Sequence, residues 1–460
     1  MNISRRNFIG KSCAAMSYAT LFSSLVNLKT FAAAALDNSS LLDGDYKALV
    51  FVMQSGGNDS FNMLIPRGTT EYAEYALSRS DIAIPQGDLL AINPITTDGR
   101  TFGLHPELTA LQNLFENNKL AFISNVGTLV EPTTKTQFQE GTVQTPLGLF
   151  SHSDQQQQWH SGRPHERTNI GWGGRIADLV QSMNSNDSIS MNISLQGTNI
   201  FQYGQEVIPY VINNEGSIGI RDYGEFDPFN ILRTQALNTM MERDYEDVFK
   251  NTYINTVKAS NESSIEFQEA IDAVSEFATV IPEGNSLAEQ LRMVAKTIAA
   301  RDTLGFQRQV FFVEASGWDH HNELLISHAD LLQEFNEALG YFNDLTEELG
   351  VLDNVTTFSI SDFGRTLSSN GNGTDHAWGG NVMVMGGAVN GKDMYGSYPS
   401  LDLASDLSLY DRGILIPTTP IDKYFAELAT WFGVSATDVN MIFPNLANFD
   451  DTPLGFMNII

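Results

Sequence analysis

Three short apolar runs constrain this chain most, because each ends abruptly in a group of Gly, Asp or His residues. They span residues 48–53, 309–313 and 355–360. Runs that are apolar throughout are typical of strands buried on both faces, as in parallel sheets covered by helices. The carboxyl ends of such strands share one edge of the sheet, where α/β proteins bind their ligands. The sequence therefore predicts an α/β fold with its site at that edge.

Amphipathic segments between these runs support the same class. A helix is expected to begin at His105-Pro106-Glu107, and a strand at 120–124 follows it. Further helices are expected over 262–280, 286–303, 324–349 and 421–432. This alternation favours a largely parallel central sheet with helices on both faces.

Residues 196–260 differ in composition from the rest of the chain. They carry many Gly, Asn and Tyr residues with short apolar pieces. We expect one large domain over 36–460, with 196–260 inserted as a cap over the sheet edge. Tyr203, Tyr210 and Tyr223 either line a substrate mouth there or pack against the main domain.

The charge balance excludes two classes of partner. The 460 residues include 26 basic and 55 acidic ones, a net charge of -29. Nucleic acids and anionic membrane surfaces are also negative, so neither is expected to bind. No run of 18 or more apolar residues follows the first 35 residues, so no membrane span is expected in the mature chain.

The first 35 residues have the order of an export leader. Ser4-Arg5-Arg6-Asn7-Phe8-Ile9 resembles the twin-arginine signal, an apolar stretch over 13–26 follows, and a small-residue run over 32–35 suits cleavage. We therefore expect export by the twin-arginine machinery to the periplasm or the exterior. The only cysteine, Cys13, lies in this leader, so the mature protein would have no thiol.

Asp and His residues follow all three apolar runs. They are Asp59 after the first, Asp319, His320 and His321 after the second, and Asp362 after the third, with Asp375-His376 in the next loop. Carboxylate and imidazole together suit zinc, manganese or iron. Because the strand ends share one edge, we expect these side chains to converge on a divalent metal. Gly57-Asn58-Asp59 alone would suit a simple turn equally well.

Two further residues are candidates for catalysis. Ser151 precedes an expected helix, and a serine at a helix start lies among free backbone N–H groups that stabilise negative charge. It would serve as a nucleophile, although Ser151 or Ser153 acting only as a helix cap explains the pattern too. Arg365 could grip anionic oxygens with two N–H groups, or form a structural ion pair.

Several motifs resemble a known family. They are GGNDSFN at 56–62, HPEL at 105–108, SHSDQQQQW at 151–159, GWDHH at 317–321, SDFGRT at 361–366 and GTDHAWGG at 373–380. With the leader, they resemble exported bacterial proteins called domain of unknown function 1501 (DUF1501). That family looks like a distant branch of the alkaline phosphatase and sulfatase superfamily, which implies an alkaline-phosphatase-like fold.

The resemblance also implies roles for individual residues. Ser151 would be the nucleophile. One metal would be held by Asp319, His321 and His376, and a second by Asp59 and Asp362. The superfamily often has an Asp-His pair at the second metal, whereas Phe363 follows Asp362 here. That imidazole is therefore missing, or it comes from His152 or His320.

These observations predict an exported metal-dependent hydrolase of phosphate esters, or of related sulfate or phosphonate esters. Its substrate would be a small anionic ester, and its cofactor a divalent metal such as zinc, manganese or magnesium. A sulfatase with a modified cysteine is disfavoured, because the mature chain has no cysteine. The alternative is a non-catalytic exported metal-binding or scaffold protein on the same fold.

Overall fold

The structure is a computed structural model that describes residues 46–96 and 98–459. The leader predicted over 1–35 lies outside the described residues. Within the described ranges, no helix is long and apolar enough to cross a membrane.

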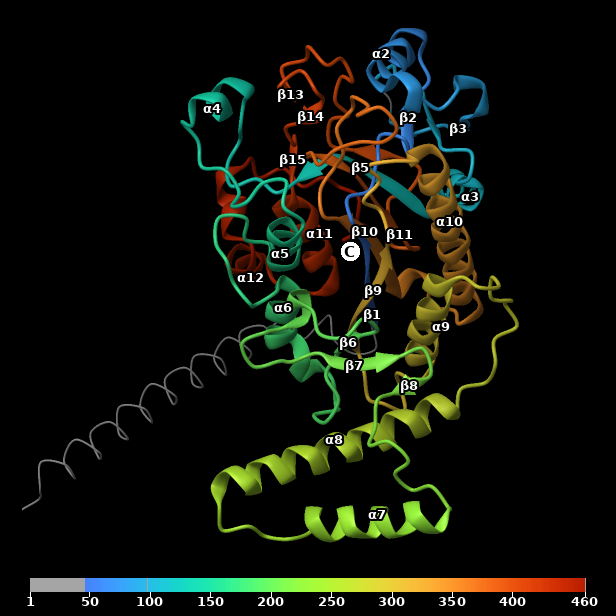
Figure 1. Cartoon of the computed structure of the whole chain (residues 1–460), viewed down its shortest axis with the longest axis vertical. Coiled ribbons are helices and arrows are strands. Elements are labelled where there is room, and N and C mark those ends of the chain that lie inside the picture. Colours follow the sequence, from blue (N-terminus) through green and yellow to red (C-terminus); the bar gives the residue numbers. More distant parts are fainter. Residues whose placement is uncertain (1–45, 97, 460) are drawn as a thin grey trace, which may run out of the picture. The chain divides into compact units, whose positions relative to one another are not determined.

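A ten-stranded sheet forms the centre of the described chain (Figure 1). The strand order is β12-β5-β11-β10-β1-β9-β6-β7-β8, and β15 also pairs with β5. The bounds are β1 Lys47–Ser55, β5 Leu120–Gly127, β6 Asn192–Ser194, β7 Tyr210–Asn213, β8 Gly216–Ser217, β9 Arg308–Ser316, β10 Val355–Ser361, β11 Gly380–Met385, β12 Met394–Tyr395 and β15 Thr419–Pro420. Only β11 and β8 run antiparallel to their neighbours. The predicted α/β class with a largely parallel sheet is confirmed.

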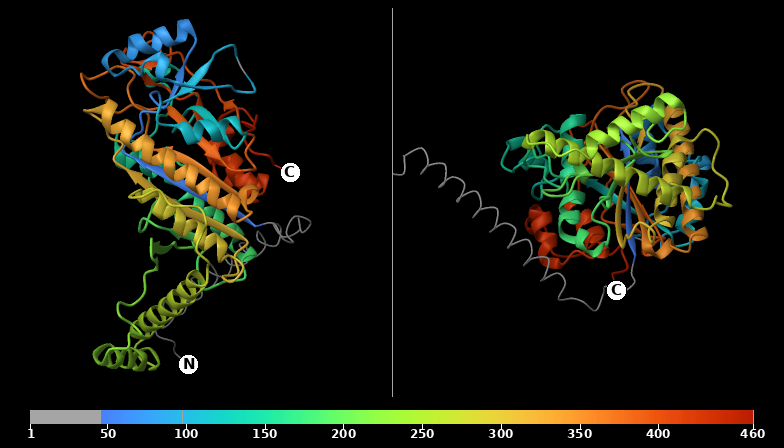
Figure 2. Two further views of the ribbon diagram at one scale, coloured as in Figure 1. Left: turned by 90° about the vertical axis from the view of Figure 1, so that its right-hand side faces the viewer. Right: turned by 90° about the horizontal axis from the view of Figure 1, so that it is seen from below.

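Helices lie on both faces of the sheet, as predicted (Figures 1 and 2). One face carries α3 Thr109–Glu116, α9 Ser286–Ala299 and α10 Leu324–Glu348. The other carries α5 His152–Ser161, α6 Trp172–Val180, α11 Ile421–Phe432 and α12 Ala436–Ile442. The remaining elements are α2 Thr69–Arg79, α4 Lys135–Glu140, α7 Pro228–Met241, α8 Val248–Asp272, a small sheet of β2 Leu64–Pro66, β4 Phe102–Leu104 and β3 Leu90–Ile92, and a pair of β13 Ser408–Leu409 and β14 Ile414–Leu415.

The three central strands are held in register by aromatic side chains. Phe51 of β1 lies opposite Phe312 of β9 and Phe358 of β10. Its ring centroid is 5.3 Å from that of Phe312 and 5.1 Å from that of Phe358, and all three rings are buried. This register brings the carboxyl ends of the three strands to one level, so the residues that follow them meet.

Two helix boundaries differ from expectation. The helix expected at residue 105 begins at Thr109, because His105 to Leu108 form a turn in which the Leu108 N–H donates to the His105 carbonyl over 3.0 Å. The helix expected at 262 begins at Val248, where the side chain of Asp247 caps it. Residues 196–260 contain β7, β8, α7 and part of α8. Their role as a cap stays a prediction.

Candidate metal centre

The site is built where β1, β9 and β10 end. The chain turns sharply after β1 at Gly56, whose φ of 122° favours glycine. A Cβ atom at Gly56 would lie 2.6 Å from the backbone nitrogen of Asp319. The missing side chain therefore lets the end of β1 pack directly against the segment that carries Asp319.

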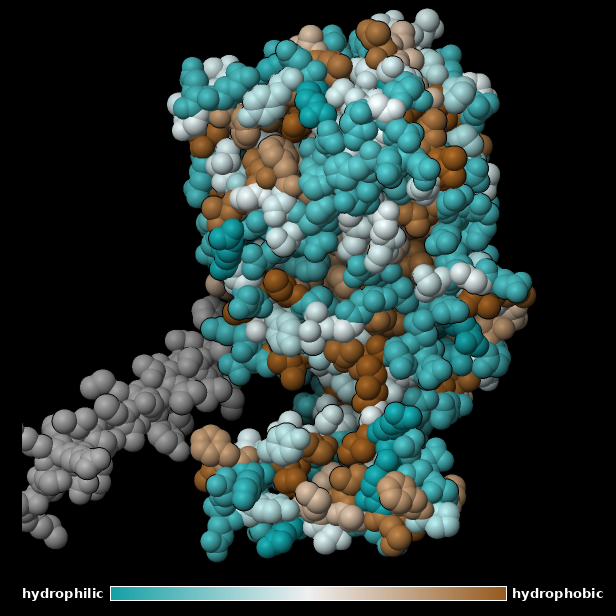
Figure 3. Space-filling view, viewed as in Figure 1, coloured by the Kyte–Doolittle hydropathy of each residue, from teal (hydrophilic) through white to brown (hydrophobic). Residues whose placement is uncertain are grey.

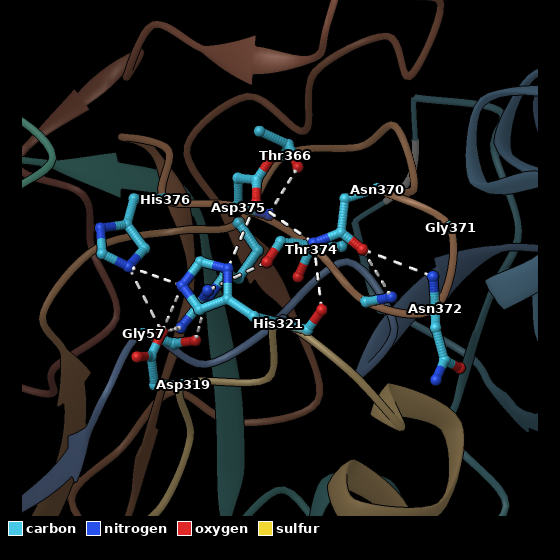
Figure 4. A network of polar contacts seen from close by, with 12 residues as sticks. Gly57, Asp319, His321, Thr366, Asn370, Gly371, Asn372, Thr374, Asp375 and His376 are labelled. Atoms are coloured by element: carbon cyan, nitrogen blue, oxygen red, sulfur yellow. Dashed lines mark hydrogen bonds and ion pairs between the residues drawn. The ribbon is translucent and has the colours of Figure 1, made fainter.

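Three imidazoles surround the carboxylate of Asp319. The Nε2 atoms of His321 and His376 lie 3.1 and 3.3 Å from Asp319 Oδ1, and His152 Nε2 lies 3.5 Å from Asp319 Oδ2. Figure 4 shows His321 and His376 pointing toward this carboxylate. Donor atoms of His152, Asp319 and His376 all lie within 4.8 Å of one another, a group that could hold a metal ion. The four side chains are 24–43% exposed, so solutes can reach them.

The second nitrogen of each ring has a fixed partner. His152 Nδ1 lies 2.6 Å from Asp362 Oδ2, His321 Nδ1 lies 3.2 Å from Asp375 Oδ1, and His376 Nδ1 lies 2.8 Å from the Phe150 carbonyl. Carboxylate and carbonyl oxygens accept hydrogen bonds, so all three Nδ1 atoms donate. Metal-binding histidines are oriented in this way, with the lone pair of Nε2 left for the ion.

This arrangement creates a conflict that a cation resolves. His321 Nε2 and His376 Nε2 are 3.0 Å apart. With both Nδ1 atoms donating, two lone pairs face each other and repel unless a proton or a metal ion lies between them. Burial lowers the pKa of His376, and the charges of Arg365 and His152 lower it further. The proton is thereby disfavoured on His376, and the donor set fits a divalent metal.

Arg365 fixes the position of Asp319. Its buried guanidinium bonds to Asp319 Oδ1 and to backbone carbonyls, including that of Gly57 at 2.8 Å and that of Thr374 at 3.2 Å. Burial raises the pKa of Asp319, but hydrogen bonding and charge from Arg365 outweigh it and leave that pKa below its usual value. Arg365 thus ties together the segments after β1, β9 and β10. Its predicted contact with substrate stays a prediction.

Asp375 and Asp362 lie behind the imidazoles. Burial raises the pKa of Asp375, yet hydrogen bonds from Arg412 and Asn370 hold it below its usual value, so the group is a charged acceptor for His321. Asp362 is fully buried, and its Oδ1 accepts from the Gly56 N–H over 3.1 Å. The structure therefore places Asp362 next to His152, on the side away from Asp319. Direct binding of a metal by Asp362 stays a prediction.

Ser151 lies at the start of α5, between Phe150, whose carbonyl orients His376, and His152 of the cluster. It is the N-cap, and its Oγ accepts from the Asp154 N–H over 3.4 Å. The preceding residue, Phe150, has a φ of 70°, which is strained for a side chain of its size. Phe150 bonds to His376 and His152 belongs to the cluster, so the backbone on both sides of Ser151 is tied to the site. The expected cap is confirmed, and the nucleophile stays a prediction.

Asp59 and His320 lie in a separate, buried polar cluster. Asp59 forms an ion pair with Arg79, and both side chains are at most 1% exposed. The His320 ring packs 5.7 Å from that of His328, which in turn lies 6.1 Å from that of His105. The structure thus does not bring Asp59 or His320 into the group around Asp319, and their predicted metal binding stays untested.

His152 is the residue of the site that the predicted ligand set left out. It reaches Asp319 from α5, which lies outside the three strands that guided the prediction. The sequence signal lies in Ser151-His152-Ser153-Asp154, and the structure places His152, one of the two histidines expected beside Asp362, 2.6 Å from that carboxylate. Sequence spacing alone could not decide between His152 and His320.

The model of one protein family matches this chain over residues 46–410. The family is described as "Protein of unknown function (DUF1501)". No curated protein matches the sequence.

Solved structures similar to this chain have low identity to it. The crystal structure of PsFucS1 sulfatase from Pseudoalteromonas sp. matches with 13% identity and a TM-score of 0.33, covering 86% of this chain and 74% of that one. Lipoteichoic acid synthase LtaP from Listeria monocytogenes matches with 7% identity and a TM-score of 0.31, covering 80% and 74%. A mutant of alkaline phosphatase PafA matches with 13% identity and a TM-score of 0.24, covering 70% and 64%.

Proposed function

Although the chain belongs to the DUF1501 family, whose description names no activity, we propose from its site that it is a metal-dependent hydrolase of phosphate or related anionic esters. One observation supports this most: three imidazoles direct Nε2 toward the Asp319 carboxylate while oxygen atoms bind each Nδ1. Metal-binding histidines donate their second N–H group to such oxygen atoms, which fixes the orientation of the ring.

The ligands of the metal would be His152, His321, His376 and Asp319. Three imidazoles and one carboxylate favour zinc, or manganese or iron, over magnesium, which prefers oxygen ligands and water. A divalent cation held there would neutralise oxygens of the ester and lower the pKa of a bound hydroxyl. The partly exposed side chains leave room for a small substrate to approach.

The nucleophile would be Ser151. Its Oγ would attack the phosphorus or sulfur of the ester, the bond to the alcohol would break, and water would then release the acid from the serine. Backbone N–H groups at the start of α5 would offset charge on the oxygens of the transferring group. Because His152 and the Phe150 carbonyl belong to the cluster on either side of Ser151, the serine and the metal would act on one substrate.

A second candidate is a non-catalytic scaffold with one structural ion. Asp59, expected at a second metal, instead pairs with Arg79 in the described structure. Within residues 46–96 and 98–459, the carboxylate and imidazole groups close enough for a metal form one cluster, and this favours a single ion. Asp319→Asn separates the scaffold from the hydrolase. In a scaffold this substitution would lower only the stability, whereas in a hydrolase it would also abolish turnover.

The activity is tested on purified protein loaded with zinc or manganese. We expect turnover of an aryl phosphate, sulfate or phosphonate ester, and we expect Ser151→Ala to abolish it while the metal content stays unchanged. Ser275→Ala is the matched control, because this exposed serine lies outside the cluster, whereas Ser153 Oγ is 3.3 Å from Ser151 Oγ. Absence of turnover with all three esters in metal-loaded protein would favour the scaffold.

Export by the twin-arginine pathway belongs to the same proposal. A periplasmic or secreted location would fit a hydrolase of small anionic esters. Replacing Arg5 and Arg6 by lysines should retain the protein inside the cell, as detected by fractionation.

A further inference from the structure

Residues 228–258, here called the arm, carry an apolar surface. None of the residues of the metal centre belongs to the arm. The arm consists of α7, the loop 242–247 and the first part of α8. Figures 1 and 2 show it beyond the edge strand β8, and Figure 3 shows hydrophobic side chains on its surface. Met241 is the one residue of α7 that is buried.

The exposed apolar residues of α7 form one stripe. Phe229, Leu232 and Met240 are 71%, 66% and 50% exposed. With Ala236 they repeat at three- and four-residue spacing, which places them on one side of the helix. Leu237 and Met241 lie on a different side and are better covered. The stripe on α7 is therefore directed away from the rest of the described chain.

Helix α8 shows the same feature along a single face. In its second half this face is covered: Phe267 packs 5.3 Å from the ring of Tyr210, and Ser264 Oγ lies 2.9 Å from Ser217 Oγ. In its first half the same face carries Phe249 and Tyr253, which are 87% and 68% exposed. An amphipathic face buries its apolar side chains against a partner. Residues 46–96 and 98–459 leave the first half of this face of α8 without one.

Charge decides between two kinds of partner. The arm has four basic residues, Arg233, Arg243, Lys250 and Lys258, and four acidic ones, Glu242, Asp244, Glu246 and Asp247. It is neutral in a chain of net charge -29, so two arms can meet where other surfaces of two copies repel each other. Its acids all lie in the loop 242–247, which a hairpin inserting into lipid would bury first, at high cost.

The loop and the helices of the arm are also complementary. The loop 242–247 carries four acids and Arg243, a net charge of -3. On the helices, Arg233 pairs with Asp222 at 3.2 Å and Lys258 lies 3.9 Å from Glu262 of its own chain, which leaves Lys250 for the acidic loop of a second copy. Two arms packed antiparallel about a two-fold axis would lay the acidic loop of each along the helices of the other. The apolar stripes would then form the core of a four-helix bundle.

We propose that the arm binds the arm of a second copy of this chain, so that the protein is a homodimer. The dimer contact is independent of the metal and of turnover. The metal centre of each copy would lie outside the contact, because none of its residues belongs to the arm.

The test measures mass in solution by sedimentation and light scattering between about 1 and 100 μM. We expect twice the mass of one chain for the wild type. Leu232→Glu and Phe249→Glu should each weaken dimerisation at least about a hundredfold, because each places a charge in the centre of a packed apolar contact. Leu77→Glu, at a residue of α2 that is 83% exposed, is the matched control and should remain dimeric. Circular dichroism should be the same for all four proteins.

A monomeric wild type at 100 μM would overturn the proposal, as would dimers that persist in Phe249→Glu. Flotation with neutral phosphatidylcholine vesicles covers the lipid alternative. Binding to vesicles by a monomeric wild type, lost in Phe249→Glu, would assign the arm to lipid and contradict the dimer. Metal content and ester turnover are measured on the same samples, so failure of the proposed activity is distinguished from failure of the dimer.

Discussion

His320 and His321 are neighbours in the sequence, yet they belong to two groups of histidines whose surroundings differ. His321 belongs to the partly exposed cluster around Asp319, where its Nδ1 contacts the Asp375 carboxylate. His320 is buried on the other side of the same segment, next to the ring of His328. In the buried group, His328 Nε2 contacts an amide oxygen, that of Asn58, at 2.9 Å. Carboxylates and a carbonyl orient the rings of the first group, whereas packing dominates in the second.

The difference shows what a histidine needs in order to be a ligand here. In the cluster around Asp319, the rings are oriented by oxygen acceptors and share one carboxylate. In the buried group, burial lowers the pKa of His105 to about 4 and lowers that of His328 as well. These rings stay neutral and serve packing. The segment turns tightly here, because the His320 N–H donates to the Trp318 carbonyl and the His321 N–H donates to the Asp319 carbonyl. The two neighbouring rings thus end in different surroundings.

The largest difference in metal content and turnover should appear between the variants His321→Ala and His320→Ala. His321→Ala should remove the metal and reduce turnover at least about a hundredfold, since a metal ion contributes several kcal/mol to the reaction. His320→Ala should keep the metal and lose about 1–3 kcal/mol of stability through lost packing. Metal analysis and urea unfolding of both variants test the comparison. A His320→Ala protein without metal would break it.

A smaller effect is expected from the acids behind the imidazoles. Asp362→Asn should weaken metal binding about 10–100-fold, because the ring of His152 loses its charged acceptor. Asp375→Asn should act on His321 in the same way, and titration with a competing chelator measures both. Complete loss of metal in Asp362→Asn alone would instead indicate direct binding by Asp362.

The buried histidines should make the stability of the protein depend on pH. The pKa of His105 is lowered to about 4 by burial, so between pH 6.5 and 4 the unfolded chain binds a proton that the native chain does not. Stability must therefore fall as the pH falls through this window, by about 1.4 kcal/mol per pH unit for each such group. His105→Gln should reduce the slope by about that amount in urea unfolding with chelator present. An unchanged slope would show that His105 titrates normally in the native protein.

The sequence predicted the sheet well because its signal is local. The apolar runs that became β1, β9 and β10 are continuous and end in turn-forming residues, and parallel strands place their ends together. The antiparallel pairing of β11 was not predicted, because pairing direction depends on which neighbour a strand meets.

The site was harder to predict than the sheet. Asp319, His321 and His376 are brought together by strand ends, whereas His152 arrives on a helix from a distant part of the chain. No pattern in the sequence shows whether His320 or His321, in the segment after β9, lies on the side of α5. The choice between His320 and His321 therefore required the three-dimensional arrangement.

The most direct test of the metal centre is a crystal structure of protein soaked with zinc, with anomalous data collected at the zinc edge. We predict one strong peak about 2.0–2.2 Å from the Nε2 atoms of His152, His321 and His376 and from a carboxylate oxygen of Asp319. A peak bound instead by Asp59 or His320, or no peak at saturating zinc, would contradict this account.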